Sequence, residues 1–247
     1  MRIAIVGGRG TLGSYVTAEL ARRGHDVRVL SRSGEYRVDL TTGEGLAAAL
    51  EGCAAVVDAS NATRGAAHVL VEGSRRLLAA GNAAGVTHHV CVSIVGCNRV
   101  PFGYYRVKTD QERVVEQGPV PWSIVQATQF HELAAAAFGA AGKFRVLPAP
   151  RFPLQTVAAA EVAVAVADVT EGQPRHGRLQ VAGPEVRTAA ELARTWRRVT
   201  GRPALLLPVP LPGKTGRELR QGALTATDPD VRGTIVFADW LAAREQG

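Results

Sequence analysis

The chain has 247 residues, of which 46% are hydrophobic, 21% charged and 5% aromatic, and its formal net charge is +7. These values lie near the averages of globular proteins, so they exclude intrinsically disordered, collagen-like and disulfide-scaffold proteins. No apolar run reaches the roughly 20 residues that span a bilayer, and even the most apolar stretch, 158–169, contains Glu161 and Asp168. The N-terminal apolar run, residues 2–6, is too short for a signal peptide. We therefore expect a cytoplasmic protein that does not interact with membranes.

The N-terminal half alternates short apolar runs with helical patterns. Residues 2–6 are typical of a buried strand, and the helix that follows carries Leu12, Val16 and Leu20 on one face and ends at Gly24. Such alternation implies right-handed βαβ units and a parallel sheet covered on both faces, which is a doubly wound α/β fold of the Rossmann type. Strands are expected at 2–6, 27–30, 36–40, 54–59, 87–92 and 122–125, and helices at 11–23, 46–50, 66–84 and 104–117.

Beyond residue 129 the order of elements is less regular. Helices are expected at 132–141, 160–170, 189–200 and 237–243, while prolines at 148–153 and 203–212 indicate loops and edges. No internal repeat or linker divides the chain. We therefore predict a single domain, 1–247, in which residues 130–247 contribute a small C-terminal cap over the substrate.

Charge and cysteine patterns bear on the partners. The chain has 26 Arg and 3 Lys, and they are scattered rather than clustered, so nucleic-acid binding is not expected. A basic balance suits a phosphorylated cofactor. Cys53, Cys91 and Cys97 lack CxxC spacing, and His88-His89 has no further ligand at metal spacing, so no metal site is expected. Monomer and homodimer both remain open.

A glycine-rich loop follows the first expected strand and opens the first helix. In this context glycines permit a tight turn and close approach of a pyrophosphate to the helix N-terminus. Two phases overlap, GxxGxxG and GxGxxG, and the glycine directly after the strand favours the first. A plain glycine-rich turn is the alternative. The predicted phosphate-binding residues are Gly7, Gly8, Arg9, Gly10, Thr11, Leu12 and Gly13.

The end of the second strand indicates which dinucleotide is bound. An NAD enzyme usually has an acidic residue there for the ribose 2′-OH. This chain has Ser31, Arg32 and Ser33 instead, and Arg32 can pair with a 2′-phosphate while Arg9 closes over it. We therefore predict NADP(H) as the cofactor. The alternative is that Arg32 is a solvated loop residue.

Four further segments narrow the family: VSIVG at 92–96, GYYRVK at 103–108, PWSIVQATQF at 121–130 and AGPE at 182–185. With the glycine loop, they resemble the atypical, NmrA-like branch of the short-chain dehydrogenase/reductase superfamily, whose members bind NAD(P). The resemblance spans essentially the whole chain. It implies the doubly wound fold and matches Tyr104 and Lys108 to the superfamily's YxxxK pair, Ser93 to its substrate-orienting serine, and Asp39-Leu40 to its adenine-bracketing position.

Tyr104 and Lys108 share one helix face because they are four residues apart. A free tyrosine has a pKa of about 10, and a nearby ammonium favours the phenolate. Tyr104 could then give a proton to a carbonyl oxygen. The alternative is that Lys108 only anchors the ribose while Tyr104 lines the pocket. Tyr105, rotated by about 100°, is expected to be packing or surface.

Ligands of open parallel sheets bind beyond the carboxyl ends of the strands, where the strand order reverses. This rule places Gly7 beside Ser60 and Asn61. It also places the residues after the sixth strand near the nicotinamide; these are Ala127, Thr128 and Gln129.

Three functions remain open from the sequence. The first is an NADPH-dependent oxidoreductase of a small or medium-sized apolar carbonyl or enone, because the cap is rich in Ala, Val, Leu and Pro. The second is an NADP-binding sensor or regulatory module without turnover, which the resemblance permits. The third is an NADP-dependent cyclase or lyase that uses Tyr104 as an acid in a non-redox step.

Overall fold

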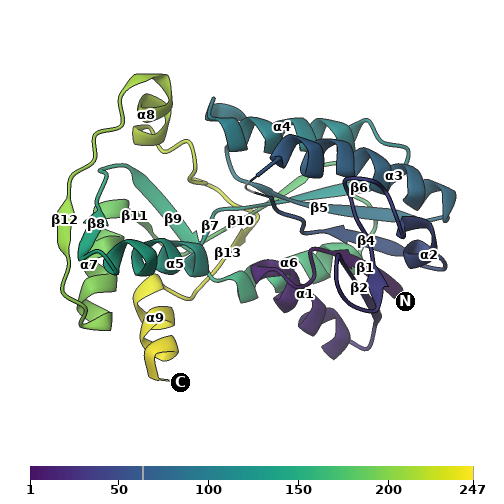
Figure 1. Ribbon diagram of the computed structural model, residues 1–247, viewed down its shortest axis with the longest axis horizontal. Helices are drawn as coiled ribbons and strands as arrows, with labels where there is room; N and C mark the ends of the chain where they lie inside the picture. The colour runs from purple at the N-terminus through teal and green to yellow at the C-terminus, as the bar shows by residue number, and fades with distance from the viewer. Residues whose placement is uncertain (63, 247) are drawn as a thin grey trace.

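The structure is a computed structural model that describes residues 1–62 and 64–246. Its centre is a parallel sheet in the order β13-β10-β6-β5-β4-β1-β2-β3 (Figure 1). The α/β, doubly wound fold expected from the sequence is confirmed. The strands of this sheet are β1 (Arg2–Val6), β2 (Asp26–Ser31), β3 (Tyr36–Arg37), β4 (Ala55–Asp58), β5 (His88–Ile94), β6 (Trp122–Ala127), β10 (Arg178–Ala182) and β13 (Val231–Arg232).

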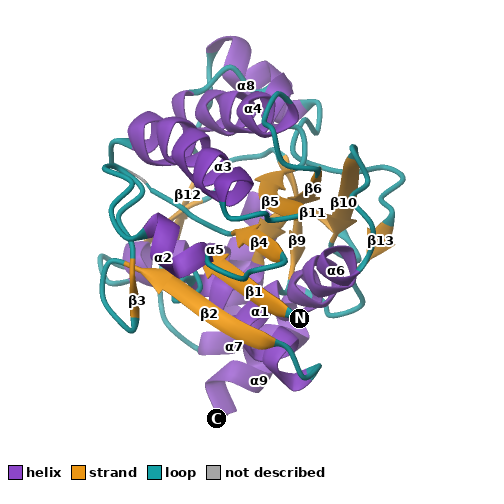
Figure 2. Ribbon diagram, turned by 90° about the vertical axis from the view of Figure 1, so that its right-hand side faces the viewer, coloured by secondary structure: helices purple, strands orange, loops and turns teal. Residues whose placement is uncertain are grey.

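Two helical layers cover the sheet (Figure 2). Side chains alternate along each strand, so β1 sends Ile3 and Ile5 to one face and Ala4 and Val6 to the other. The first face packs on α1 (Thr11–Arg22) and α6 (Ala159–Glu171). The second packs on α2 (Leu46–Leu50), α3 (Gly73–Ala83) and α4 (Gly103–Glu116).

The cap lies beyond the carboxyl ends of the central strands (Figure 1). It has its own apolar core, in which Phe138, Trp196 and Phe237 pack together. Within 130–247, however, α6, β10 and β13 return to the main sheet. The cap elements are β7 (Gln129–Phe130), α5 (His131–Gly142), β8 (Val146–Pro148), β9 (Pro153–Val157), β11 (Val186–Thr188), α7 (Ala189–Thr200), β12 (Leu205–Leu207), α8 (Gly213–Arg220) and α9 (Phe237–Gln246).

Three local features differ from the expectations. The third strand ends at Arg37 rather than residue 40. The helix expected at 66–84 begins as a π-helix, η1 (Ala67–Glu72), and becomes α-helical at Gly73. Helix α8, which was not expected, follows directly after the prolines at 203–212, and Pro212 stands at its N-cap, where the missing N–H of proline does not interrupt a helix.

The strand order reverses between β1 and β4. The chain leaves β1 toward β2 on one side, and β4 toward β5 on the other. The loops after β1 and β4 therefore diverge, and a crevice for a ligand is expected between them. In the part of the chain that the structure describes, no helix is both long and apolar enough to cross a membrane.

Candidate functional site

The loop after β1 brings a helix N-terminus against the end of β4. Gly7 has φ +74°, and a Cβ there would lie 2.6 Å from the carbonyl oxygen of Ala59. A Cβ at Gly13 would overlap the carbonyl oxygen of Gly7. These two positions therefore require glycine, as the GxxGxxG phase predicts. The loop lies beside Ser60, as the crevice rule predicts, because a Cβ at Gly7 would also be 3.0 Å from the Cα of Ser60.

The residues around this loop fit a dinucleotide pyrophosphate. Gly10 is the N-cap of α1 and provides no side-chain cap, so the first amides of the helix are available to an anion. A Cβ at Gly10 would meet only the oxygen of Gly7, at 3.2 Å, so the space above the loop is open. Thr11 is exposed and Leu12 is buried in the core. Beside the loop, the buried hydroxyl oxygen of Ser60 has no hydrogen-bond partner among the described residues.

Basic and hydroxyl groups gather at the carboxyl end of β2. Arg9 Nη1 donates hydrogen bonds to the carbonyl oxygen of Ser33 at 2.8 Å and to its Oγ at 2.9 Å. The Ser31 hydroxyl donates to the same carbonyl oxygen. Arg32 is exposed. The nearest acidic residue of the strand, Asp26, lies at its other end and pairs with Arg2.

Asp39 and Leu40 differ in their surroundings. Asp39 Oδ1 accepts hydrogen bonds from the hydroxyl and the N–H of Thr41, and these bonds, with a smaller effect of the Arg32 charge, lower the pKa of Asp39. The Leu40 side chain belongs to the core under α3. The charge of Arg32 therefore acts on Asp39, whereas the buried side chain of Leu40 fixes this loop to the core.

Tyr104 meets the segment that follows β4. Its hydroxyl donates a 2.8 Å hydrogen bond to Oδ1 of Asn61. The expectation that a nearby ammonium lowers the pKa of Tyr104 is wrong here: burial raises that pKa, and the phenol is neutral near pH 7. The neighbouring ring of Tyr105 lies 6.1 Å away at an interplanar angle of 70° and packs into an apolar cluster with Val100 and Leu224.

Lys108 lies one turn further along α4 and is buried. Its Nζ donates to the carbonyl oxygen of Val92 at 2.7 Å and to Oε1 of Gln111. Among the described side chains, no hydrogen bond joins Lys108 to Tyr104. The two residues therefore share a helix face as predicted, but different partners hold them.

Ser93 is buried at the end of β5, on the sheet face under α4. Its Oγ lies 3.9 Å from Sγ of Cys97, and that thiol donates to Oε1 of Glu112 at 3.4 Å. Glu112 also pairs with Arg178 of β10 at 3.1 Å. In this arrangement Ser93 contributes to a polar network that joins the sheet to α4.

The residues after β6 turn the chain toward the cap. Ala127 is buried in the core, and Thr128 Oγ1 accepts a 3.2 Å hydrogen bond from the N–H of Gly183. Gln129 pairs with Thr156 of β9. His131 packs on Phe237 and Trp240 at 5.5 and 5.6 Å between ring centroids, so its role is structural.

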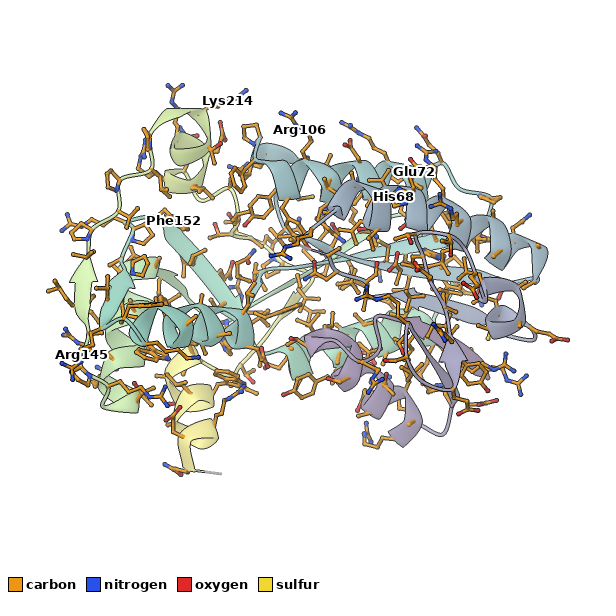
Figure 3. The ribbon with its side chains drawn as sticks, viewed as in Figure 1. His68, Glu72, Arg106, Arg145, Phe152 and Lys214 are labelled. Carbon is orange, nitrogen blue, oxygen red and sulfur yellow. The ribbon has the colours of Figure 1, made fainter. Side chains whose placement is uncertain are left out.

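Several residues of the site escaped prediction from the sequence. Gln111 links Lys108 to Asp58, and Phe152 joins Tyr105 in an apolar cluster between α4 and the cap. Figure 3 shows Phe152 on the cap side and Arg106 on the α4 side. The three-residue spacing of Lys108 and Gln111 was an available signal, since it places both on one helix face. No pattern in the sequence links Phe152 to α4.

A separate hollow of about 490 Å³ lies at the amino ends of the strands. Met1, Ala54, Thr87 and Pro121 line it, and each precedes a strand of the main sheet. It is therefore at the opposite edge of the sheet from Gly7 and Tyr104.

The model of a family described as NAD(P)H-binding matches residues 7–172. An NADPH-dependent quinone oxidoreductase from Escherichia coli, solved with NADPH, has a TM-score of 0.83 at 18% identity, with 98% of this chain and 99% of that chain covered. A nucleoside-diphosphate-sugar epimerase from Staphylococcus aureus has a TM-score of 0.79 at 15% identity, with 98% and 100% covered.

A short-chain dehydrogenase/reductase superfamily protein from Agrobacterium tumefaciens, solved with bound NAD, has a TM-score of 0.74 at 19% identity, with 100% of this chain and 98% of that chain covered. No curated protein matches this sequence significantly. At such low identities the structural likeness shows the fold.

Proposed function

Because the chain belongs to the NAD(P)H-binding family, in the atypical, NmrA-like branch of the short-chain dehydrogenase/reductase superfamily, we propose that it is an NADPH-dependent oxidoreductase. Its substrate is a small or medium-sized apolar carbonyl or enone, and Tyr104 is the proton donor. The observation that carries this proposal is the position of Tyr104. Its hydroxyl lies against Asn61, directly after β4, where the cofactor crevice is expected.

The reaction needs a hydride and a proton. NADPH, when held by the glycine loop after β1 and by Lys108, would supply the hydride for the carbonyl carbon. Tyr104 gives its proton to the carbonyl oxygen, and solvent later replaces that proton. The phenol of Tyr104 carries its proton at neutral pH and can donate it, while burial, which raises its pKa, makes it a weaker acid than a free tyrosine. Asn61 Oδ1 holds the hydroxyl at the crevice until the substrate oxygen takes over as acceptor.

Lys108 is proposed to hold the nicotinamide ribose. An ammonium has three N–H donors, and Val92 and Gln111 accept two of them. The third is left for a ribose hydroxyl. The buried side chain therefore acts as a fixed donor rather than as a mobile charge.

The preference for NADPH rests on the cluster at the end of β2. Arg9 is already held against Ser33, and Arg32 is exposed beside it. Two guanidinium groups, with no carboxylate among residues 31–33, favour a 2′-phosphate over a 2′-hydroxyl.

The apolar substrate is supported by the cluster between α4 and the cap. Ile94, Tyr105, Phe152 and Leu211 are half-buried there, around buried Leu224. These side chains offer apolar and aromatic surface next to Tyr104.

A second candidate is a non-redox reaction, a cyclisation or an elimination. The observation that favours it is again the neutral phenol, which can act as an acid without any hydride transfer. A sensor without turnover would use neither the proton of Tyr104 nor a hydride from NADPH. Oxidation of NADPH separates these alternatives from the proposal.

The test is single-turnover NADPH oxidation with a substrate found by screening carbonyls and quinones. Tyr104→Phe removes only the hydroxyl, so it should slow the reaction by roughly 10²–10⁴-fold and leave the Kd for NADPH nearly unchanged. Tyr105→Phe is the matched control and should be almost silent. Lys108→Ala should weaken both binding and rate. Full activity of Tyr104→Phe would remove the tyrosine from the mechanism and favour the other two functions.

A further inference from the structure

A buried chain of hydrogen bonds connects Lys108 to the end of β4. The ammonium donates to Oε1 of Gln111, and Nε2 of Gln111 donates to Oδ2 of Asp58 and to Oγ of Ser74, both at 3.0 Å. Asp58 Oδ2 also accepts from the Ser74 hydroxyl at 3.0 Å, and its Oδ1 accepts from the N–H of Ser60 at 3.0 Å. The chain thus reaches the segment that borders the cofactor crevice.

The orientation of the Gln111 amide follows from its neighbours. An ammonium only donates hydrogen bonds and a carboxylate only accepts them. The oxygen of the amide must therefore face Lys108, and its nitrogen must face Asp58. One neutral side chain in this way joins a buried cation to a buried anion and satisfies both.

Burial makes the arrangement sensitive to change. Lys108 is 3% exposed, Gln111 1% and Asp58 1%. Burying a charge without a partner costs free energy, so the positions of its two acceptors determine where the ammonium of Lys108 lies. The Val92 oxygen belongs to the backbone of β5, whereas the Gln111 oxygen belongs to a side chain whose position depends on its own hydrogen bonds to Asp58 and Ser74.

We infer that Gln111 is a positioning residue, which aims the remaining N–H of Lys108 at the cofactor through its link to Asp58. This inference rests on the proposed function, since it assumes that Lys108 contacts the nicotinamide ribose. Asp58 is the anchor of the link, and Ser74 holds the anchor.

The main test exchanges the two end groups. In the double variant Asp58→Asn/Gln111→Glu, a carboxylate accepts from Lys108 and an amide donates to that carboxylate, so the connectivity and net charge are kept. Each single variant breaks the pattern: Gln111→Glu sets two carboxylates together, and Asp58→Asn removes the anion. We expect each single variant to bind NADPH about tenfold more weakly, the scale of one charge-assisted hydrogen bond, and the double variant to return to within about threefold of wild type.

A second measurement follows the ammonium itself. The chain has three lysines, and Lys143 and Lys214 are exposed. Labelling lysine Nζ with ¹⁵N should give a slowly exchanging signal for Lys108 alone, because only it is held by buried acceptors. Gln111→Met, similar in shape but unable to accept the hydrogen bond, should abolish or broaden that signal. A loss of thermal stability alone would not distinguish a positioning role from packing, so the signal and the double variant decide.

The outcomes separate this inference from the proposed function. If Lys108→Met weakens NADPH binding but Gln111→Met and Gln111→Glu do not, Gln111 does not position the lysine and the inference is overturned, while the proposed function stands. If Lys108→Met itself binds NADPH as wild type does, the lysine is not a cofactor ligand. The inference and the proposed role of Lys108 then fall, while the activity of Tyr104→Phe still decides the proposed function. If both single variants and the double variant bind NADPH weakly, the link between Gln111 and Asp58 does not position Lys108, and the inference is overturned.

Discussion

Arg32 is the residue expected to select the cofactor. It is exposed at the end of β2, next to Arg9 and Ser33, and can pair with a 2′-phosphate. Arg32→Ala should weaken NADPH binding by about tenfold or more, because a charge-assisted hydrogen bond contributes ~1.5–3 kcal/mol. The Kd for NADH should remain unchanged. Calorimetry with both cofactors measures this difference.

Arg37→Ala is the matched control, since Arg37 is also exposed and lies on the neighbouring strand β3. It should leave both dissociation constants unchanged. Equal affinity of the wild type for NADPH and NADH would remove the assignment to NADP.

Gly10 offers a test of the phosphate loop that the other glycines do not. Its backbone, φ −79° and ψ 176°, is one that any residue adopts, and a Cβ there would meet only the oxygen of Gly7. Gly10→Val should therefore fold, yet its methyl groups would fill the space expected for the pyrophosphate. NADPH binding should be lost, as measured by fluorescence titration.

Gly139→Val, on the cap helix α5, is the control because a Cβ there would have no neighbour within 4 Å. It should bind NADPH normally. A folded Gly10→Val that binds with the wild-type Kd would mean that the loop is not the phosphate site.

At the residue scale, local sequence patterns predicted many positions of the candidate site. The positions of Gly7 and Gly13 follow from a strand–loop–helix pattern, because close approach of the backbone demands glycine there. The contact of Tyr104 with Asn61 does not follow from any such pattern. It depends on how the start of α4 meets the segment after β4, and 43 residues separate the two side chains in sequence.

At the element scale, the buried strands and the helices were predictable, including the cap helices α5, α7 and α9, whereas the short strands of the cap were not. The strands of the central sheet with four or more residues and near-continuous apolar runs, such as β1 and β5, are evident from the sequence. The short strands β7, β11 and β13 have two or three residues each and pair with distant segments, so they carry no periodic signal of their own. The π-helix η1 likewise has no periodic sequence signal that distinguishes it from an α-helix.

A buried histidine in strand β5, His89, should make the stability of the protein depend on pH. Burial lowers the pKa of His89 to about 4, against an opposing effect of Asp58 and a small added effect of His88. In the unfolded chain His89 takes up a proton near its ordinary pKa of about 6.5. Between pH 6.5 and 4 the unfolded state thus binds more protons, so stability should fall as the pH falls through this window.

We expect the free energy of unfolding to decrease by roughly 2 kcal/mol between pH 7 and pH 5 on account of His89. Urea unfolding at the two pH values measures it, and His89→Leu should show a smaller decrease. His68→Gln, at an exposed histidine, should behave as the wild type does. The ion pairs of Glu19, whose pKa is lowered to about 2, are lost only at lower pH and do not interfere. An equal decrease in His89→Leu would assign the acid sensitivity elsewhere.

At the scale of the whole molecule, the sheet and the cap supply different parts of the proposed reaction. The loops after β1, β2 and β4 carry the groups that fit a dinucleotide, and α4 carries Tyr104 and Lys108. The cap carries apolar side chains but none of the predicted phosphate-binding residues. A change in the cap should accordingly alter substrate binding while it leaves cofactor binding intact.

Phe152 tests this division of roles. It is a cap residue that packs with Tyr105 in the apolar cluster beside Tyr104. Phe152→Ala removes part of the apolar surface offered to the substrate, so KM should rise about tenfold, as expected for the loss of roughly 1–2 kcal/mol of apolar contact. The Kd for NADPH should not change. Phe144→Ala is the matched control, because Phe144 is a cap phenylalanine that is 82% exposed, and its KM should equal that of the wild type. If Phe152→Ala weakened NADPH binding and left KM unchanged, the cap would belong to the cofactor site rather than to the substrate pocket.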